Sequence, residues 1–161
     1  MKYSSSTYLR DVEKYKLYLY KNDNEAIVIK KILKITNDFS LIEFNEKIKL
    51  MDNGYYVTEI IPLNDNYICR LFLDDELNII EEYYTVTKNN GIRDGIPIYE
   101  DLGLSYIKLN SKHKIYHEEK LIDGDEYLKS SLEKIKKLNL NTENLILNIK
   151  KVVKFNENSN W

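Results

Sequence analysis

The sequence predicts an α+β protein, with an antiparallel, barrel-like β body of about seven to nine strands and two C-terminal helices packed on it. Short β-rich segments alternate with turn clusters between residues 8 and 120, which is typical of an antiparallel meander. Apolar residues then adopt helical spacing over residues 123–155. The 14 tyrosines suit half-buried strand surfaces. We expect the 161 residues to form one domain, since they suffice for one core and show no repeat.

The first strand is ambiguous in the sequence. Tyr8, Val12, Tyr15 and Leu19 recur at helical spacing. A strand over residues 15–20 fits equally, and the turn cluster at residues 21–24 favours it. We therefore predict a hairpin of strands 15–20 and 26–35.

Further strands follow at regular intervals, each bounded by turn residues. The predicted ranges are 39–44, 46–50, 55–61, 67–73, 79–87, 96–109 and 114–120. Between two of them, residues 88–95 are polar and contain two glycines, which predicts a rim loop or lid. Within 96–109, Asp101, Gly103 and Ser105 alternate onto one face, where a ligand could lie.

Two helices are predicted at the C-terminal end. Asp123 is a plausible N-cap, because Glu126 follows it at capping-box spacing. Leu128, Leu132, Ile135 and Leu138 form the apolar stripe of the first helix. Asn141 or Thr142 caps the second, with a stripe of Leu145, Ile149, Val152 and Val153.

Composition excludes some classes of protein. The formal net charge of −2, from 26 acidic and 24 basic residues, argues against a nucleic-acid partner. Cys69 is the only cysteine, so an intrachain disulfide is excluded, and burial as a small apolar side chain is expected. The sequence has no N-terminal apolar signal segment and no apolar run of 18 residues, which predicts a cytoplasmic protein without a membrane partner.

Several short motifs follow one another in a familiar order: Gly54–Tyr56, Pro62–Tyr67, Ile80–Thr87, Pro97–Ser105 and Leu121–Glu126. Over roughly residues 50–150 the chain resembles the family called domain of unknown function 402. That family includes nucleoside tri- and diphosphatases and a cytidylyl-phosphonate hydrolase. The resemblance implies a barrel-like body and a carboxylate cluster that binds two divalent metals.

The resemblance assigns Asp101, Asp123 and Glu126 as metal ligands, with Mg²⁺ or Mn²⁺ as the metal. Hard divalent cations prefer such carboxylate oxygens, and two metals can stabilise the attacking and leaving oxygens of a phosphoryl displacement. Two further ligand positions of the family are occupied by the hydroxyls Thr85 and Ser105. Fewer carboxylates bind dications more weakly, which favours divergence away from catalysis.

The late acidic motif can be placed in two ways. Asp123–Glu126 matches it only if about five residues are inserted in the preceding hairpin, whereas an ungapped alignment places His117–Lys120 there. Members of this family carry a basic residue in their N-terminal segment that is implicated in handling the substrate phosphate. Arg10 is its nearest equivalent here, although a solvated basic face with Lys14 and Lys16 explains it as well. We interpret His113 as a surface residue.

Three functions remain open. The first is a metal-dependent hydrolase of nucleoside di- or triphosphates or related phosphate esters, with Arg10 as the catalytic basic residue. The second is a catalytically degenerate relative that binds a ligand or regulates. The third is an oligomer of identical chains whose exposed tyrosines form an interface.

Overall fold

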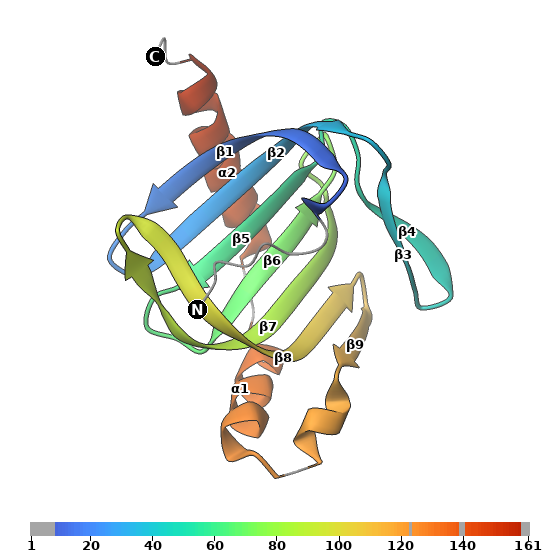
Figure 1. The fold of residues 1–161 in the computed structure, drawn as a ribbon, viewed down its shortest axis with the longest axis vertical. Coiled ribbons are helices and arrows are strands. Elements are labelled where there is room, and N and C mark those ends of the chain that lie inside the picture. The colour runs from blue at the N-terminus through green and yellow to red at the C-terminus, as the bar shows by residue number, and fades with distance from the viewer. Residues whose placement is uncertain (1–8, 123, 139–140, 159–161) are drawn as a thin grey trace.

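The computed structural model describes residues 9–122, 124–138 and 141–158. Seven strands form one antiparallel sheet in the order β1-β2-β5-β6-β7-β8-β9, and β3 pairs with β4 in a separate ribbon (Figure 1). The strands are β1 Val12–Lys21, β2 Glu25–Ile35, β3 Phe39–Glu43, β4 Glu46–Met51, β5 Tyr56–Pro62, β6 Tyr67–Leu73, β7 Ile79–Arg93, β8 Ile96–Leu109 and β9 Lys112–Tyr116. The helices are η2 Glu118–Leu121, α1 Glu126–Lys136 and α2 Thr142–Asn158. The predicted α+β class is confirmed.

The first element is the strand β1, so the strand alternative is confirmed over the helical spacing. Its Tyr18 is 3% exposed, and Tyr18 is paired with Ile29 of β2. Alternation along β1 leaves Tyr15, Leu17 and Leu19 on the opposite face. The helical pattern was misleading because tyrosines lie on both faces of this strand.

The body is barrel-like, but the ladder of main-chain hydrogen bonds does not close, because β1 and β9 are the two edges of the sheet. The long β7–β8 hairpin bends back over the sheet toward the end of β1 (Figure 1). There Lys21 Nζ donates to the carbonyl oxygen of Gly95, over 3.2 Å. This side-chain contact takes the place of a closing strand pair.

The predicted rim loop at residues 88–95 is wrong in its secondary structure. Strand β7 continues to Arg93, and the turn is confined to Asp94 and Gly95, both with positive φ. Asn90 stabilises this extension of β7, because its Nδ2 donates to the carbonyl oxygens of Pro62 and Tyr67, each over 2.9 Å. Tertiary contacts therefore override the polar, glycine-containing composition.

A bulge interrupts β8 where the sequence predicted regular alternation. Thr85 pairs with Ser105 and Thr87 with Asp101, so β8 uses four residues where β7 uses two. Gly103 lies in this bulge at φ +81°. Consequently Asp101 is exposed whereas Ser105 is 4% exposed, so Asp101, Gly103 and Ser105 do not form the continuous face that the sequence predicted.

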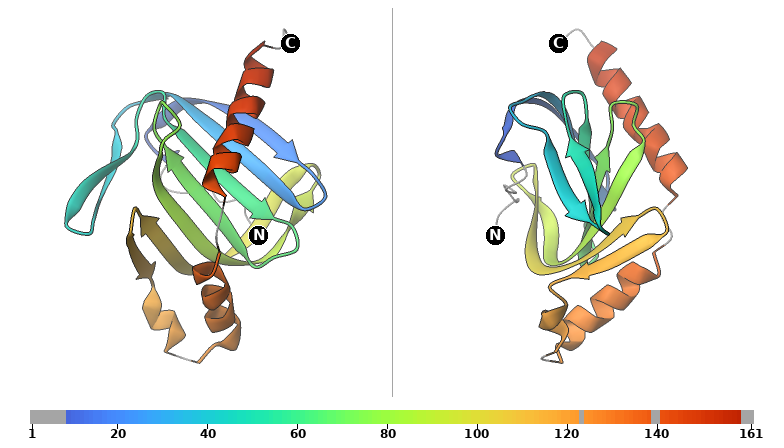
Figure 2. Two further views of the ribbon diagram at one scale, coloured as in Figure 1. Left: turned by 180° about the vertical axis from the view of Figure 1, so that it is seen from behind. Right: turned by 90° about the vertical axis from the view of Figure 1, so that its right-hand side faces the viewer.

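The two helices cover one side of the sheet, which we call the outer face (Figure 2). Leu128, Leu132 and Ile135 of α1 and Ile149 and Val153 of α2 pack there against strand residues that include Cys69, Leu71, Tyr84 and Leu104. The predicted apolar stripes are therefore confirmed. Cys69 is buried, as expected, and burial is the largest cause that raises the pKa of its thiol.

The helix starts need one correction. The N-cap of α1 is Asp125, whose carboxylate accepts from the backbone N–H of Leu128, and not Asp123. Asp123 lies outside the described residues. In α2, Asn141 Oδ1 accepts from the Asn144 N–H over 3.1 Å, so the first of the two predicted caps is confirmed.

The opposite side of the sheet is the inner face. Apolar side chains occupy its two ends, where Val57, Phe72 and Leu109 pack with the β3–β4 ribbon, and Ile61 and Ile68 pack with Tyr99 of the β7–β8 hairpin. Between these ends the inner face carries charged and hydroxyl side chains.

Candidate functional site

A buried row of charges crosses the middle of the inner face. Glu59 of β5 is directly paired with Arg70 of β6, and Arg70 is paired with Tyr83 of β7. Glu59 lies 3.7 Å from Arg70 Nη2 and 3.8 Å from Lys30 Nζ of β2. Lys30 and Glu59 are 4% and 1% exposed, and the Arg70 side chain is 11% exposed. Two cations therefore share one carboxylate, away from bulk water.

The surroundings of this row fix its geometry. The Tyr99 hydroxyl, carried by the bent-back part of β8, donates to Glu59 Oε2 over 2.9 Å. Burial lowers the pKa of Lys30, and the charge of Glu59 opposes that shift. The Arg70 guanidinium lies 5.7 Å from the centre of the Tyr83 ring, within cation–π range. Tyr83 and Arg70 remain partly exposed.

Hydroxyl groups continue the row toward β8. Thr85 Oγ1 and Ser105 Oγ lie 3.1 Å apart in a buried hydrogen bond. Burial is the largest cause that raises the pKa of the Tyr83 hydroxyl, and the neighbouring Ser105 lowers it. The two positions at which the family resemblance implies metal-binding carboxylates therefore hold hydroxyls that satisfy each other.

Two carboxyl groups lie at the ribbon end of the inner face. Glu43 of β3 and Glu81 of β7 are each 1% exposed, and the Tyr116 hydroxyl of β9 donates to Glu43 Oε1 over 2.6 Å. Burial, followed by the neighbouring carboxyl group of Glu43, raises the pKa of Glu81 to about 9. Glu81 therefore retains a proton at neutral pH.

The predicted metal ligands lie away from these buried groups. Asp101 is exposed, and its Oδ1 accepts from the Gly103 N–H over 2.7 Å. Glu126 is exposed and is the first residue of α1. The Tyr127 hydroxyl donates to the carbonyl oxygen of Thr87, the cross-strand partner of Asp101, over 2.7 Å. The fold thus brings the start of α1 to the strand pair that carries Asp101.

A lysine also reaches this strand pair. A Cβ placed on Gly103 would lie 3.1 Å from Lys120 Nζ, so an ammonium group occupies the space beside the bulge. The described residues contain no group of three or more His, Cys, Asp or Glu side chains that could hold a metal ion. Asp101 and Glu126 by themselves do not make such a group, and the predicted metal site depends on Asp123.

The other predicted residues lie on the surface. Arg10 is exposed just before β1, with Lys14 and Lys16 exposed on that strand. His117 Nδ1 lies 3.3 Å from Glu119 Oε1, and both side chains are more than half exposed. His113 is exposed, as predicted.

Sequence reasoning missed Lys30, Glu59 and Arg70. Glu59 and Arg70 are each the single charge in a predicted strand, residues 55–61 and 67–73, whereas Lys30 is next to Lys31. Because strands buried on both faces read as apolar runs, such an isolated charge signals a polar contact on one of the faces. That signal was available in the sequence.

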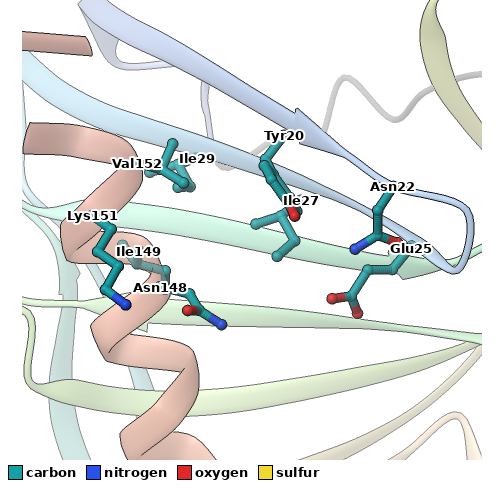
Figure 3. A pocket seen from close by; sticks show the side chains of 9 residues that line it. All are labelled: Tyr20, Asn22, Glu25, Ile27, Ile29, Asn148, Ile149, Lys151 and Val152. Carbon is teal, nitrogen blue, oxygen red and sulfur yellow. Dashed lines mark hydrogen bonds between the residues drawn. The ribbon is translucent and has the colours of Figure 1, made fainter. Parts of the chain in front are cut away.

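A separate hollow of about 290 Å³ lies on the outer face, between α2 and the β1–β2 hairpin (Figure 3). Ile27, Ile29, Ile149 and Val152 supply its apolar lining, and Glu25 and Lys151 are among its polar residues. Lys151 is exposed and Glu25 is partly exposed. This hollow lacks the buried charges of the inner face, so the inner face is the stronger candidate site.

Comparison with known proteins gives distant likenesses. No family model and no curated protein matches the chain. A complex of FomD with CDP shares 9% identity over 82% of this chain and 69% of that chain, with a TM-score of 0.44. The phosphatase SC4828 with the non-hydrolyzable nucleotide GPCP shares 9% identity over 84% and 69%, with a TM-score of 0.44. Membership of the domain of unknown function 402 family stays a prediction. No described helix is long and apolar enough to span a membrane.

Proposed function

We propose that the protein binds a nucleoside phosphate or a related phosphate ester on the inner face of its sheet, as a binding module whose hydrolytic chemistry is weakened. The observation that carries this proposal is the pair of largely buried cations Lys30 of β2 and Arg70 of β6. They lie on the two strands that flank β5, 3.8 Å and 3.7 Å from the carboxylate of Glu59. Among these three side chains, two cations lie beside one carboxylate. A guanidinium that is oriented by its neighbours and still partly exposed suits the oxygens of a phosphate group.

The hydroxyl groups around the row support binding of an ester. Tyr83 and Tyr99 flank the charges, and the Tyr83 ring contacts Arg70 at the partly exposed end. A phosphate arriving there would compete with Glu59 for the guanidinium, while the aromatic ring offers a surface for an apolar or planar group. This ligand class is that implied by the sequence resemblance.

Thr85 and Ser105 favour binding over metal-assisted hydrolysis. Their hydroxyls are buried, hydrogen-bonded to each other and uncharged, so they offer a dication no negative charge. Neutral hydroxyls in place of carboxylates weaken the affinity for Mg²⁺ or Mn²⁺.

A second candidate function is metal-dependent hydrolysis of the same esters. The contact of Tyr127 with Thr87 favours it, because this contact brings the start of α1 beside the strand pair of Asp101. Asp101, Asp123 and Glu126 would hold Mg²⁺ or Mn²⁺, which would polarise the phosphoryl group. Lys120 at the bulge disfavours a second positive charge there. Arg10 stays a proposed phosphate contact.

One experiment separates the two functions. Binding of nucleoside di- and triphosphates is measured by calorimetry, and phosphate release is measured with Mg²⁺ or Mn²⁺, for the wild type and for Asp101→Ala and Glu126→Ala. Saturable binding without metal-dependent release supports the binding module. Release that either substitution abolishes supports the hydrolase. No binding by the wild type contradicts both.

A further inference from the structure

The Glu43–Glu81 pair is an unusual feature for a protein interior. Both carboxyl groups are buried, and they come from separate sheets, Glu43 from the β3–β4 ribbon and Glu81 from β7. Within the described part of the chain, no hydrogen-bond donor reaches Glu43 Oε2 or either oxygen of Glu81. The remaining oxygen, Glu43 Oε1, accepts from the Tyr116 hydroxyl. Buried carboxyl oxygens without partners are unfavourable, so something must hold these two together.

Among the ion pairs of the described residues, none involves Glu43 or Glu81. The ribbon and the sheet meet through apolar side chains, Ile48, Leu50, Phe72 and Leu109 among them. The titratable groups that face the pair are the tyrosines Tyr116 of β9 and Tyr83 of β7, and Arg70 of β6 lies against the Tyr83 ring. Lys112 of β9 is half exposed and is paired with Glu46 at the tip of the ribbon. A proton is therefore the simplest bridge between the two carboxyl groups.

We propose that Glu43 and Glu81 form a proton-dependent latch that fixes the β3–β4 ribbon against the inner face of the sheet. With one proton on Glu81, its O–H donates to the ionised Glu43, and Tyr116 donates to the other oxygen of Glu43. Loss of that proton leaves two negative charges facing each other in an apolar setting, and the ribbon detaches. The latch is independent of which ligand the inner face binds.

The direction of the pH response follows from this geometry. In the closed state, burial and Glu43 raise the pKa of Glu81 to about 9, whereas a solvated glutamate titrates near its model value of 4.5. Closure therefore takes up one proton between these two values. By linkage, the closed fraction relative to the open fraction falls by about tenfold per pH unit in that range.

The test measures how readily a thiol under the ribbon reacts. Ile48, on β4, packs in the cluster beneath the ribbon and is 9% exposed. The full chain carrying Ile48→Cys and Cys69→Ala is alkylated between pH 6 and pH 8, and each rate is corrected for thiol ionisation with an unstructured peptide. We expect the corrected rate to rise by about tenfold per pH unit. The same protein with Glu81→Gln should lose this slope, because a glutamine amide donates to Glu43 without titrating.

Matched variants distinguish the latch from a general effect of pH. Glu43→Gln should reduce the slope, because the Glu43 carboxyl adds to burial in raising the pKa of Glu81. Glu46→Gln, an exposed carboxyl change on the same ribbon, should leave the slope intact. A corrected rate that does not change with pH in the parent protein overturns the proposal. So does an unchanged slope in a folded Glu81→Gln or Glu43→Gln protein.

Discussion

The two faces of the seven-stranded sheet differ in the kind of side chain that they bury. The outer face packs apolar strand residues such as Leu71 and Leu104 against the stripes of α1 and α2. The inner face has apolar ends, but its centre holds Lys30, Glu59 and Arg70, all largely withdrawn from water. The same strands build both faces, because alternate residues point to opposite sides.

This difference between the two faces indicates that stability and function depend on different sides of the sheet. A buried ion pair seldom stabilises more than well-packed apolar side chains of similar volume. A protein that needed only a packed interior would therefore gain little from the charges on the inner face. We infer that the outer face supplies stability and that the inner face retains its charges for recognition.

The largest expected effect is at the centre of the inner face. Glu59→Ala leaves Lys30 and Arg70 as buried cations without their shared carboxylate, which should lower the free energy of unfolding by about 3–5 kcal/mol. Urea unfolding measures this loss. Glu100→Ala, at a partly exposed position in an ion pair with Lys88, is the control and should change stability by less than about 1 kcal/mol. A small effect of Glu59→Ala would mean that the charges are not coupled as the distances indicate.

The outer face should respond through packing alone. Leu71 is fully buried in the cluster under the helices, so Leu71→Ala should lower the free energy of unfolding by about 3 kcal/mol through a cavity. Ligand binding to the inner face should persist in this variant below its melting temperature. Loss of binding in a folded Leu71→Ala protein would show that the two faces do not have separate roles.

A pH-dependent effect is expected at Glu81. Its folded-state pKa, about 9, lies above the value of 4.5 for a solvated glutamate, so the folded state binds more protons between these pH values. Its contribution to stability is complete below about pH 4.5 and is lost as pH rises toward 9, at up to about 1.4 kcal/mol per pH unit. Chemical unfolding from pH 5 to pH 8 measures the slope. Glu81→Gln should flatten it, and an equal slope in both proteins would contradict the assignment.

The smallest effect is expected at the hydroxyl pair. Ser105→Ala leaves the buried Thr85 hydroxyl without this partner and should lower the free energy of unfolding by about 1 kcal/mol. The double variant Thr85→Val with Ser105→Ala removes both hydroxyls and should be less destabilised than the sum of the two single variants. Additive losses would show that the two hydroxyls do not depend on each other.

Much of the fold was predictable from alternation and turn residues. The strands from β2 to β6 lie within two residues of their predicted ends, because their apolar runs are bounded by polar turns such as Asn64–Asn66. The extension of β7 to Arg93 was not predictable, since it depends on the contacts of Asn90 with Pro62 and Tyr67. Local composition carries no information about such distant partners.

The candidate site was less predictable than the fold. Asp101 and Glu126 were singled out by motif, yet both are exposed, and Asp123 lies outside the described residues. Strand pairing alone brings together Lys30, Glu59 and Arg70, which lie too far apart in the sequence to form a short motif. The sequence alone can indicate that a charged side chain is unusual in an apolar strand. The register of strand pairing determines which of these side chains lie next to one another.

The central claim is that the inner face, and not the hollow under α2, binds the phosphate ester. The most direct measurement is the calorimetric affinity of one nucleoside diphosphate for the wild type, Arg70→Gln and Lys151→Gln, each confirmed to be folded. Arg70 lies in the inner row, and Lys151 lines the outer hollow. We predict that Arg70→Gln weakens binding by about tenfold or more, since it removes charge-assisted hydrogen bonds, while Lys151→Gln leaves the affinity unchanged. The reverse pattern would contradict the account and place the ligand on the outer face.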